Sequence, residues 1–128
     1  MKVLDSTFLI DVLRGRPEAK EIIEKETSLL TTQINMYEVI TEFFYQNLPR
    51  SKFAIILNLF EDIRVLPLDE DAVVKSADVC AALMKEGVMI DDCDCLTAGI
   101  ALSHGVSTII TRNDQHFRRV KGLKVISY

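Results

Sequence analysis

Acidic residues from widely separated parts of the chain carry the chemistry that this sequence can do. Asp5 follows a short apolar run, Glu38 and Asp94 lie in stretches of helical periodicity, and Asn113 and Asp114 follow a late apolar run. Carboxylate and amide oxygens suit Mg²⁺ or Mn²⁺, and no histidine pair of the kind that zinc prefers lies close to these acids. The residue types therefore indicate a site for a hard divalent cation, provided that the fold brings the acids together.

The elements that must position these acids alternate along the chain. Apolar runs bounded by turn residues predict strands, and the stretches between them repeat their apolar positions at helical spacing. Near-strict alternation of the two predicts a parallel sheet with both faces covered by helices. We expect a three-layer α/β/α, Rossmann-like fold with a central, mostly parallel sheet of about five strands, at residues 3–5, 29–32, 63–68, 106–111 and 123–127.

The expected sheet explains how distant acids could meet. In open α/β sheets, ligands bind outside the carboxyl ends of the strands, where the strand order reverses. Asp5 ends the first strand, Glu38 lies about one turn into the helix after the second, and Asp94 lies in the first turn of the helix before the fourth. Asn113 and Asp114 directly follow the fourth strand. Such a group of carboxylates is costly without a counter-ion, and a divalent cation removes that cost.

Length and composition fit one folded domain over residues 1–128. The chain is 48% hydrophobic and 27% charged, which is ordinary for a globular protein. Its net charge of −4 argues against a nucleic-acid partner unless basic residues are grouped. Arg112, Arg118 and Arg119 are grouped near the end of the sheet that would carry the acids. They are our candidates for contacts with RNA phosphates, although such a run is usually only a solvated face.

The cysteines and the apolar runs bear on location. Three cysteines cannot all pair with one another, and their spacing does not form a disulfide framework, which favours a reducing compartment. An acid at position 5 interrupts the start before a signal peptide could form, and no apolar run reaches the ~18 residues that cross a bilayer. We expect a cytoplasmic protein with no membrane partner.

Four motifs in order resemble those of one known family. Residues 3–10 resemble the opening motif of PIN domains, and residues 35–39 are similar to the segment that carries their glutamate. Residues 93–101 resemble their aspartate-led helix of small residues, and residues 109–117 with 122–125 resemble the end of VapC-type toxins. In this sequence they read VLDSTFLI, NMYEV, CDCLTAGIA, IITRNDQHF and GLKV. The resemblance spans essentially the whole chain.

The resemblance implies a function and a set of roles. It implies an endoribonuclease in which Asp5, Glu38 and Asp94 hold Mg²⁺ or Mn²⁺, with Asn113 and Asp114 completing the catalytic site. It also implies that the cation lowers the pKa of a bound water, which then attacks an RNA phosphodiester in line. It further implies a homodimer and, for a toxin of a toxin-antitoxin pair, an antitoxin partner that blocks the acidic pocket or displaces its metal.

This chain departs from the family pattern near its end. Some relatives carry an aspartate where Asn113 stands, and many carry an acid at the position of His116. Asparagine can still supply a neutral oxygen or orient a water, so the identity of the fourth ligand stays open among Asn113, Asp114 and His116.

Other interpretations stay open for single residues. Asp5 alone could be a helix cap, and Asp91 and Asp92 compete with Asp94 as the acid of its helix. Thr111 either orients a water or merely ends a strand.

Four other functions are weighed against the toxin nuclease. One is a housekeeping PIN nuclease in RNA processing, and another is a catalytically silent PIN fold that serves as a binding module. A haloacid-dehalogenase-like phosphatase would need a second aspartate where this chain has Thr7. A nucleotide binder is disfavoured because the five glycines never cluster into a phosphate loop.

Overall fold

Five short parallel strands form the centre of the molecule. The computed structural model describes all 128 residues. The sheet has the order β3-β2-β1-β4-β5 and every pairing is parallel. Its strands are β1 (Lys2–Leu4), β2 (Leu29–Thr32), β3 (Arg64–Leu66), β4 (Thr108–Ile110) and β5 (Lys124–Ile126). All five predicted strands are confirmed, although β3, β4 and β5 are shorter than the apolar runs that predicted them.

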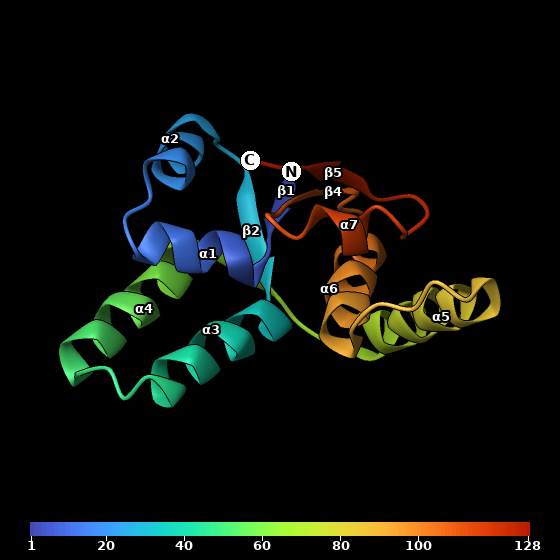
Figure 1. Cartoon of the computed structure of the whole chain (residues 1–128), viewed down its shortest axis with the longest axis horizontal. Helices are drawn as coiled ribbons and strands as arrows, with labels where there is room; N and C mark the ends of the chain where they lie inside the picture. The colour runs from blue at the N-terminus through green and yellow to red at the C-terminus, as the bar shows by residue number, and fades with distance from the viewer.

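Seven helices cover the sheet on its two faces (Figure 1). One layer holds α1 (Ser6–Leu13), α2 (Pro17–Lys25), α3 (Gln33–Tyr45) and α4 (Arg50–Asp62). The other holds α5 (Glu70–Glu86), α6 (Asp92–Ser103) and the short α7 (Asp114–Phe117). The predicted three-layer α/β/α architecture is therefore confirmed. No helix combines the length and the apolarity needed to span a bilayer.

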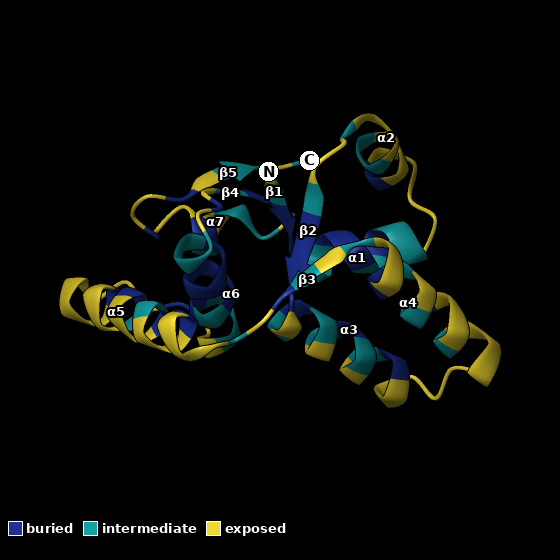
Figure 2. Ribbon diagram, turned by 180° about the vertical axis from the view of Figure 1, so that it is seen from behind, coloured by how far each residue is buried: buried dark blue, intermediate teal, exposed yellow.

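Alternation along the strands divides the core in two. Successive side chains of a strand point to opposite faces, so Val3 joins the buried cluster beneath α5 and α6, whereas Leu4 joins the cluster beneath α1, α3 and α4. Ile109 and Ile110 of β4 divide in the same way. Figure 2 shows the buried residues concentrated on the sheet and on the helix faces that meet it. Because helices cover both faces of the sheet, each strand needs apolar side chains on both sides, which explains the nearly continuous apolar runs.

The close approach of α5 and α6 fixes the helix that carries Asp94. A Cβ added at Gly99 would lie 2.0 Å from Ser76 Oγ and 2.4 Å from Ser76 Cα, so only glycine fits there. The Ser76 hydroxyl also donates to the Leu96 carbonyl at 3.4 Å. The closest approach of this helix is therefore to α5, at Gly99.

We predict that Gly99→Ala destabilises the protein. In an open helix this change would stabilise by about 0.5–1 kcal/mol. Here the added methyl group meets backbone atoms of Ser76, so we expect a loss of about 1–3 kcal/mol in the free energy of unfolding, measured by urea denaturation. Adding Ser76→Ala should not restore stability, because the Cα atom remains in the way. If Gly99→Ala were as stable as the wild type, the close contact between α5 and α6 would be contradicted.

Candidate active site

Asp5 stands at the carboxyl end of the central strand, where it caps α1 and is buried. Its Oδ1 accepts hydrogen bonds from the Phe8 amide at 3.1 Å and from the Thr7 hydroxyl at 2.7 Å. Its Oδ2 accepts from the Thr111 hydroxyl at 2.5 Å, across the gap between β1 and β4. The side chain is only 3% exposed. The capping interpretation is thus correct, and it is compatible with a place in the site because the order of strands reverses here.

A buried polar network sets the helices that carry Glu38 and Asp94. Thr32 caps α3 by accepting from the Asn35 amide at 3.2 Å, and its hydroxyl donates to Asn35 Oδ1 at 2.7 Å. Asn35 Nδ2 then donates to Thr97 Oγ1 of α6 at 3.3 Å. Since Asn35 and Glu38 are three residues apart on α3, and Asp94 and Thr97 are three apart on α6, this bond brings the two acids towards each other.

The three predicted acids lie close enough for their charges to affect one another's pKa. Burial raises the pKa of Asp5 to about 6, and the charge of Asp94 adds to the rise. Burial also raises the pKa of Glu38, with the charges of Asp94, Asp5 and Asp91 adding to it and the nearby Ser6 hydroxyl opposing it. The pKa of Asp94 is raised by burial as well, although His116 opposes that shift. Residues far apart in the sequence are therefore neighbours in space.

These acids lack basic partners of their own. No lysine or arginine lies within ion-pair distance of Asp5, Glu38, Asp91 or Asp94, and the one charged contact is His116 Nδ1, at 2.7 Å from Asp94 Oδ2. Partly buried carboxylates are normally paired or bind a cation. The donor set, mainly carboxylate oxygens, fits a hard divalent ion.

Asp91, which the sequence offered only as a rival of Asp94, lies beside it in the structure. It is the N-cap residue of α6, yet its side chain makes no capping hydrogen bond. Ligand atoms of Asp91, Asp94 and His116 all lie within 4.8 Å of one another, which is close enough to hold a metal ion. The signal available was the spacing, because residues three apart at the start of a helix share a face.

The late residues of the predicted site divide between two places. Asn113 Nδ2 donates to Asp94 Oδ2 at 3.4 Å and lies 3.1 Å from His116 Nδ1, so both side chains face the acids. Asp114 instead accepts from Arg118 Nε at 3.1 Å. Of the three candidates for a fourth position, Asn113 and His116 contact the carboxylate cluster directly, whereas Asp114 is tied to an arginine on its own helix.

The predicted RNA-binding arginines are exposed but already have partners. Arg112 Nε lies 3.3 Å from the buried Asp11 carboxylate, Arg118 pairs with Asp114, and Arg119 donates to the Met89 carbonyl at 3.0 Å. Each keeps donors free for a phosphate, because an arginine carries five N–H groups. Their contact with RNA stays a prediction.

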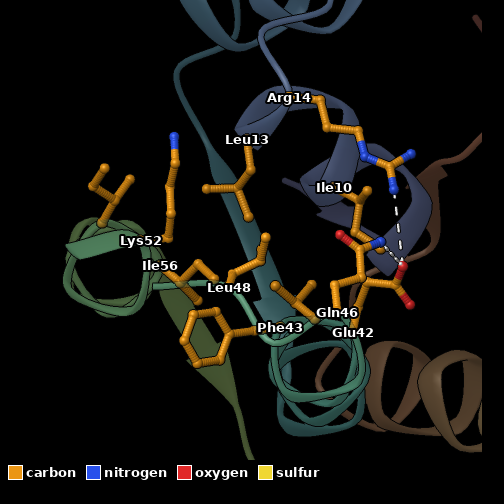
Figure 3. Close-up of a pocket in the computed structure, with 11 residues that line it drawn as sticks. Ile10, Leu13, Arg14, Glu42, Phe43, Gln46, Leu48, Lys52 and Ile56 are labelled. Atoms are coloured by element: carbon orange, nitrogen blue, oxygen red, sulfur yellow. Dashed lines mark hydrogen bonds and ion pairs between the residues drawn. The ribbon is translucent and has the colours of Figure 1, made fainter. Parts of the chain in front are cut away.

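A cavity of about 350 Å³ lies away from the acids, between α1, α3 and α4 (Figure 3). Apolar side chains, among them Leu13 and Phe43, form its floor, and Arg14 and Lys52 stand at its edge. Arg14 reaches Glu42 at 3.8 Å across one side. The cavity contains none of the predicted site residues, so the acidic pocket and this apolar cavity are separate features of the surface.

Comparison with known proteins identifies relatives along nearly the full length. The family described as PIN domain matches residues 2–123. The tRNA(fMet)-specific endonuclease VapC of Salmonella typhimurium is 25% identical over 125 residues, which cover 96% of this chain and 94% of that protein. Ribonuclease VapC1 of Methanocaldococcus jannaschii is 27% identical over 126 residues, covering 96% and 85%.

Solved structures share the fold. The DNA-bound VapBC complex from Salmonella typhimurium contains a chain that matches with a TM-score of 0.89 at 24% identity, over 98% of this chain and 96% of that one. A chain of VapBC2 from Rickettsia felis, bound to a DNA fragment from its promoter, matches with a TM-score of 0.87 at 15% identity, over 99% and 98%. At these identities the likeness supports the architecture.

We predict that metal-free protein loses stability as the pH rises from about 4 to 7, and that Asp5→Asn reduces this loss. The pKa of Asp5 rises from 3.8 to about 6 on folding, so the folded state holds the proton more tightly than the unfolded chain. Between these values the folded state binds more protons, and its stability falls with pH by up to about 3 kcal/mol from this group.

Urea denaturation in chelator at several pH values measures the effect. Adding Mg²⁺ or Mn²⁺ at neutral pH should restore stability to the wild type, because a ligand that binds only the folded state stabilises it. If the free energy of unfolding of the wild type and of Asp5→Asn depended on pH in the same way, the raised pKa of Asp5 would be contradicted.

Proposed function

Since this chain belongs to the PIN domain family, we propose that it is a metal-dependent endoribonuclease and the toxin of a VapBC-type toxin-antitoxin pair. The observation that supports the proposal is the electrostatic proximity of Asp5, Glu38 and Asp94, none of which has a lysine or arginine partner. The names of the relatives as a ribonuclease and an endonuclease support the nuclease part. We take residues 1–128 as a single PIN domain.

Asp5, Glu38 and Asp94 are the proposed ligands of Mg²⁺ or Mn²⁺, and ligand atoms of Asp91 and His116 lie within 4.8 Å of one in Asp94. When bound, such a cation supplies positive charge for the phosphate oxygens and acidifies a water for attack on phosphorus. The chain contributes orientation. Three hydrogen bonds hold the Asp5 carboxylate, so this side chain needs little reorganisation in order to bind the cation.

Other residues around the pocket have proposed supporting roles. The Thr111 and Thr7 hydroxyls donate to Asp5 and fix both of its oxygens. Asn113 Nδ2 donates to Asp94 Oδ2 and His116 Nδ1 contacts the same oxygen, and partners of this kind hold a ligand in one orientation. Asp114 stays in the proposed catalytic set as the weaker candidate, because it is paired with Arg118.

The proposed substrate is RNA, held by its backbone. Arg112, Arg118 and Arg119 are candidates for phosphate contacts, which give affinity independent of sequence even in a chain of net charge −4. Bound cation would further reduce the negative potential of the acidic pocket.

An antitoxin and a second copy of the chain are the proposed protein partners. Several structures that share the fold are described as VapBC complexes or as a toxin-antitoxin complex. The groove along α3, lined by Met36, Tyr37, Ile40 and Phe44 among others, exposes apolar area of the kind that protein contacts cover. Light scattering on the chain alone, and then with the antitoxin encoded beside it, would give both stoichiometries.

We predict that Asp5→Asn and Asp94→Asn each lower kcat/KM for RNA cleavage by about a hundredfold or more, because each removes a charge at the reacting centre. A labelled single-stranded RNA with Mg²⁺ or Mn²⁺ is the substrate, and excess chelator should abolish cleavage by the wild type. The matched control is Asp92→Asn, an exposed neighbour on the same helix that changes the net charge equally. Wild-type rates in either site variant would remove these residues from the mechanism, and absence of cleavage by folded, metal-loaded wild type would favour a silent binding module.

We also predict that Asn113→Ala impairs cleavage more than Asp114→Asn does. Asn113 contacts Asp94, and loss of a residue that orients a metal ligand typically costs about 10–100-fold in metal affinity or activity. Parallel measurements of kcat and of Mn²⁺ affinity would rank the two. The opposite ranking would place Asp114, not Asn113, at the fourth position.

A further inference from the structure

Asp11 is a buried charge that the proposed mechanism does not use. It lies on α1, has no exposed surface, and faces one hydroxyl donor and two guanidinium groups from different parts of the chain, although its Oδ1 accepts no hydrogen bond. The Tyr128 hydroxyl donates to its Oδ2 at 2.6 Å, Arg112 Nε lies 3.3 Å from the same oxygen, and Arg16 Nε lies 3.2 Å from Oδ1. Removing a carboxylate from water in this way carries a large desolvation penalty unless such partners compensate for it, so the fold requires these contacts to be made.

One of these partners belongs to the turn that lines the acidic pocket. Arg112 lies between Thr111, which donates to Asp5, and Asn113, which donates to Asp94. Its own amide donates to Thr7 Oγ1 at 3.2 Å, and the amide of Asn113 donates to Thr111 Oγ1 at 2.8 Å. The side chains of Thr111 and Asn113 thus bond the turn to the acids, and the Arg112 guanidinium bonds it to α1.

The remaining contacts of the cluster favour a fixed arrangement. The Tyr128 ring packs edge-on against Phe8 with ring centroids 5.3 Å apart, and this packing fixes the position of the hydroxyl that bonds to Asp11. Burial and the Asp11 carboxylate raise the pKa of Tyr128, which keeps its hydroxyl protonated as a donor. Arg16 approaches the same carboxylate from the segment before α2 and does not touch the turn. It therefore offers a matched comparison with Arg112.

We propose that Asp11 is a positioning residue of the candidate active site: by holding Arg112, it fixes the turn that presents Thr111 to Asp5 and Asn113 to Asp94. The proposal rests on the proposed nuclease function for its consequence in activity. Its structural part, the restraint of the turn, stands independently of that function. Arg112 acts in it through its backbone neighbours, not through a contact with substrate.

Hydrogen exchange tests the restraint without any activity measurement. We expect the amides of Arg112 and Asn113 to exchange about tenfold faster or more in Asp11→Asn and Arg112→Gln, because local opening of the turn becomes easier. Arg16→Gln, which removes an ion pair from the same carboxylate, should leave those two rates within about twofold of the wild type. Unchanged rates in Arg112→Gln and Asp11→Asn, or equal acceleration in Arg16→Gln, would overturn the proposal and leave Asp11 as a general structural residue.

Kinetics with RNA then test the consequence. Asp11→Asn and Arg112→Gln should each lower kcat by about tenfold with little change in KM. The kcat of the double variant should be no lower than that of either single variant, and Arg112→Lys should recover part of the lost kcat. If Arg112 acted only by binding a phosphate, Arg112→Gln alone would raise KM and make the salt dependence of RNA binding shallower by about 0.7 in slope, and neither variant would lower kcat. That outcome would overturn the proposal. Failure of the wild type to cut RNA would count against the nuclease function only, because the exchange rates would still decide the restraint.

Discussion

The burial of neighbouring carboxylates is the constraint on which the other features of this structure depend. Burial raises the pKa of Asp5, Glu38 and Asp94, and repulsion from nearby acids raises it further. The chain could relieve this strain by letting the acids separate into solvent. Instead Asp5 is held by three hydrogen bonds, and α3 and α6 are joined by a buried amide, so the repulsion is retained and is available to favour a bound cation.

The sheet order makes this convergence possible. β1 is central, β2 lies on one side of it and β4 on the other, so the segments leaving β1 and β4 part at the same edge. Asp5 continues from the first of these strands and Thr111 from the second, which lets one hydrogen bond join residues 106 positions apart. The same edge receives the beginnings of α3 and α6, which bring Glu38 and Asp94.

Much of this could be predicted from the sequence, for identifiable reasons. The alternation of apolar runs and helical periodicity gave the elements, and the rule for the ends of parallel strands placed Asp5 beside Asn113. The sequence left Asp91 as a rival of Asp94 because an acid before a helix usually caps it, and only the structure reveals that its side chain makes no such bond. The contact of Tyr128 with Asp11 spans 117 positions and has no local signature, so no periodicity could have predicted it.

The brevity of the strands limits how this chain can vary. With three residues in β1, Val3 and Leu4 each belong to a different buried cluster, and Asp5 follows at once. Inserting or deleting a single residue here would exchange the two faces and rotate the carboxylate away from its partners, since strand side chains alternate. Length changes should therefore accumulate in the connections far from this edge, such as the one between α3 and α4, and not in the segment around β1.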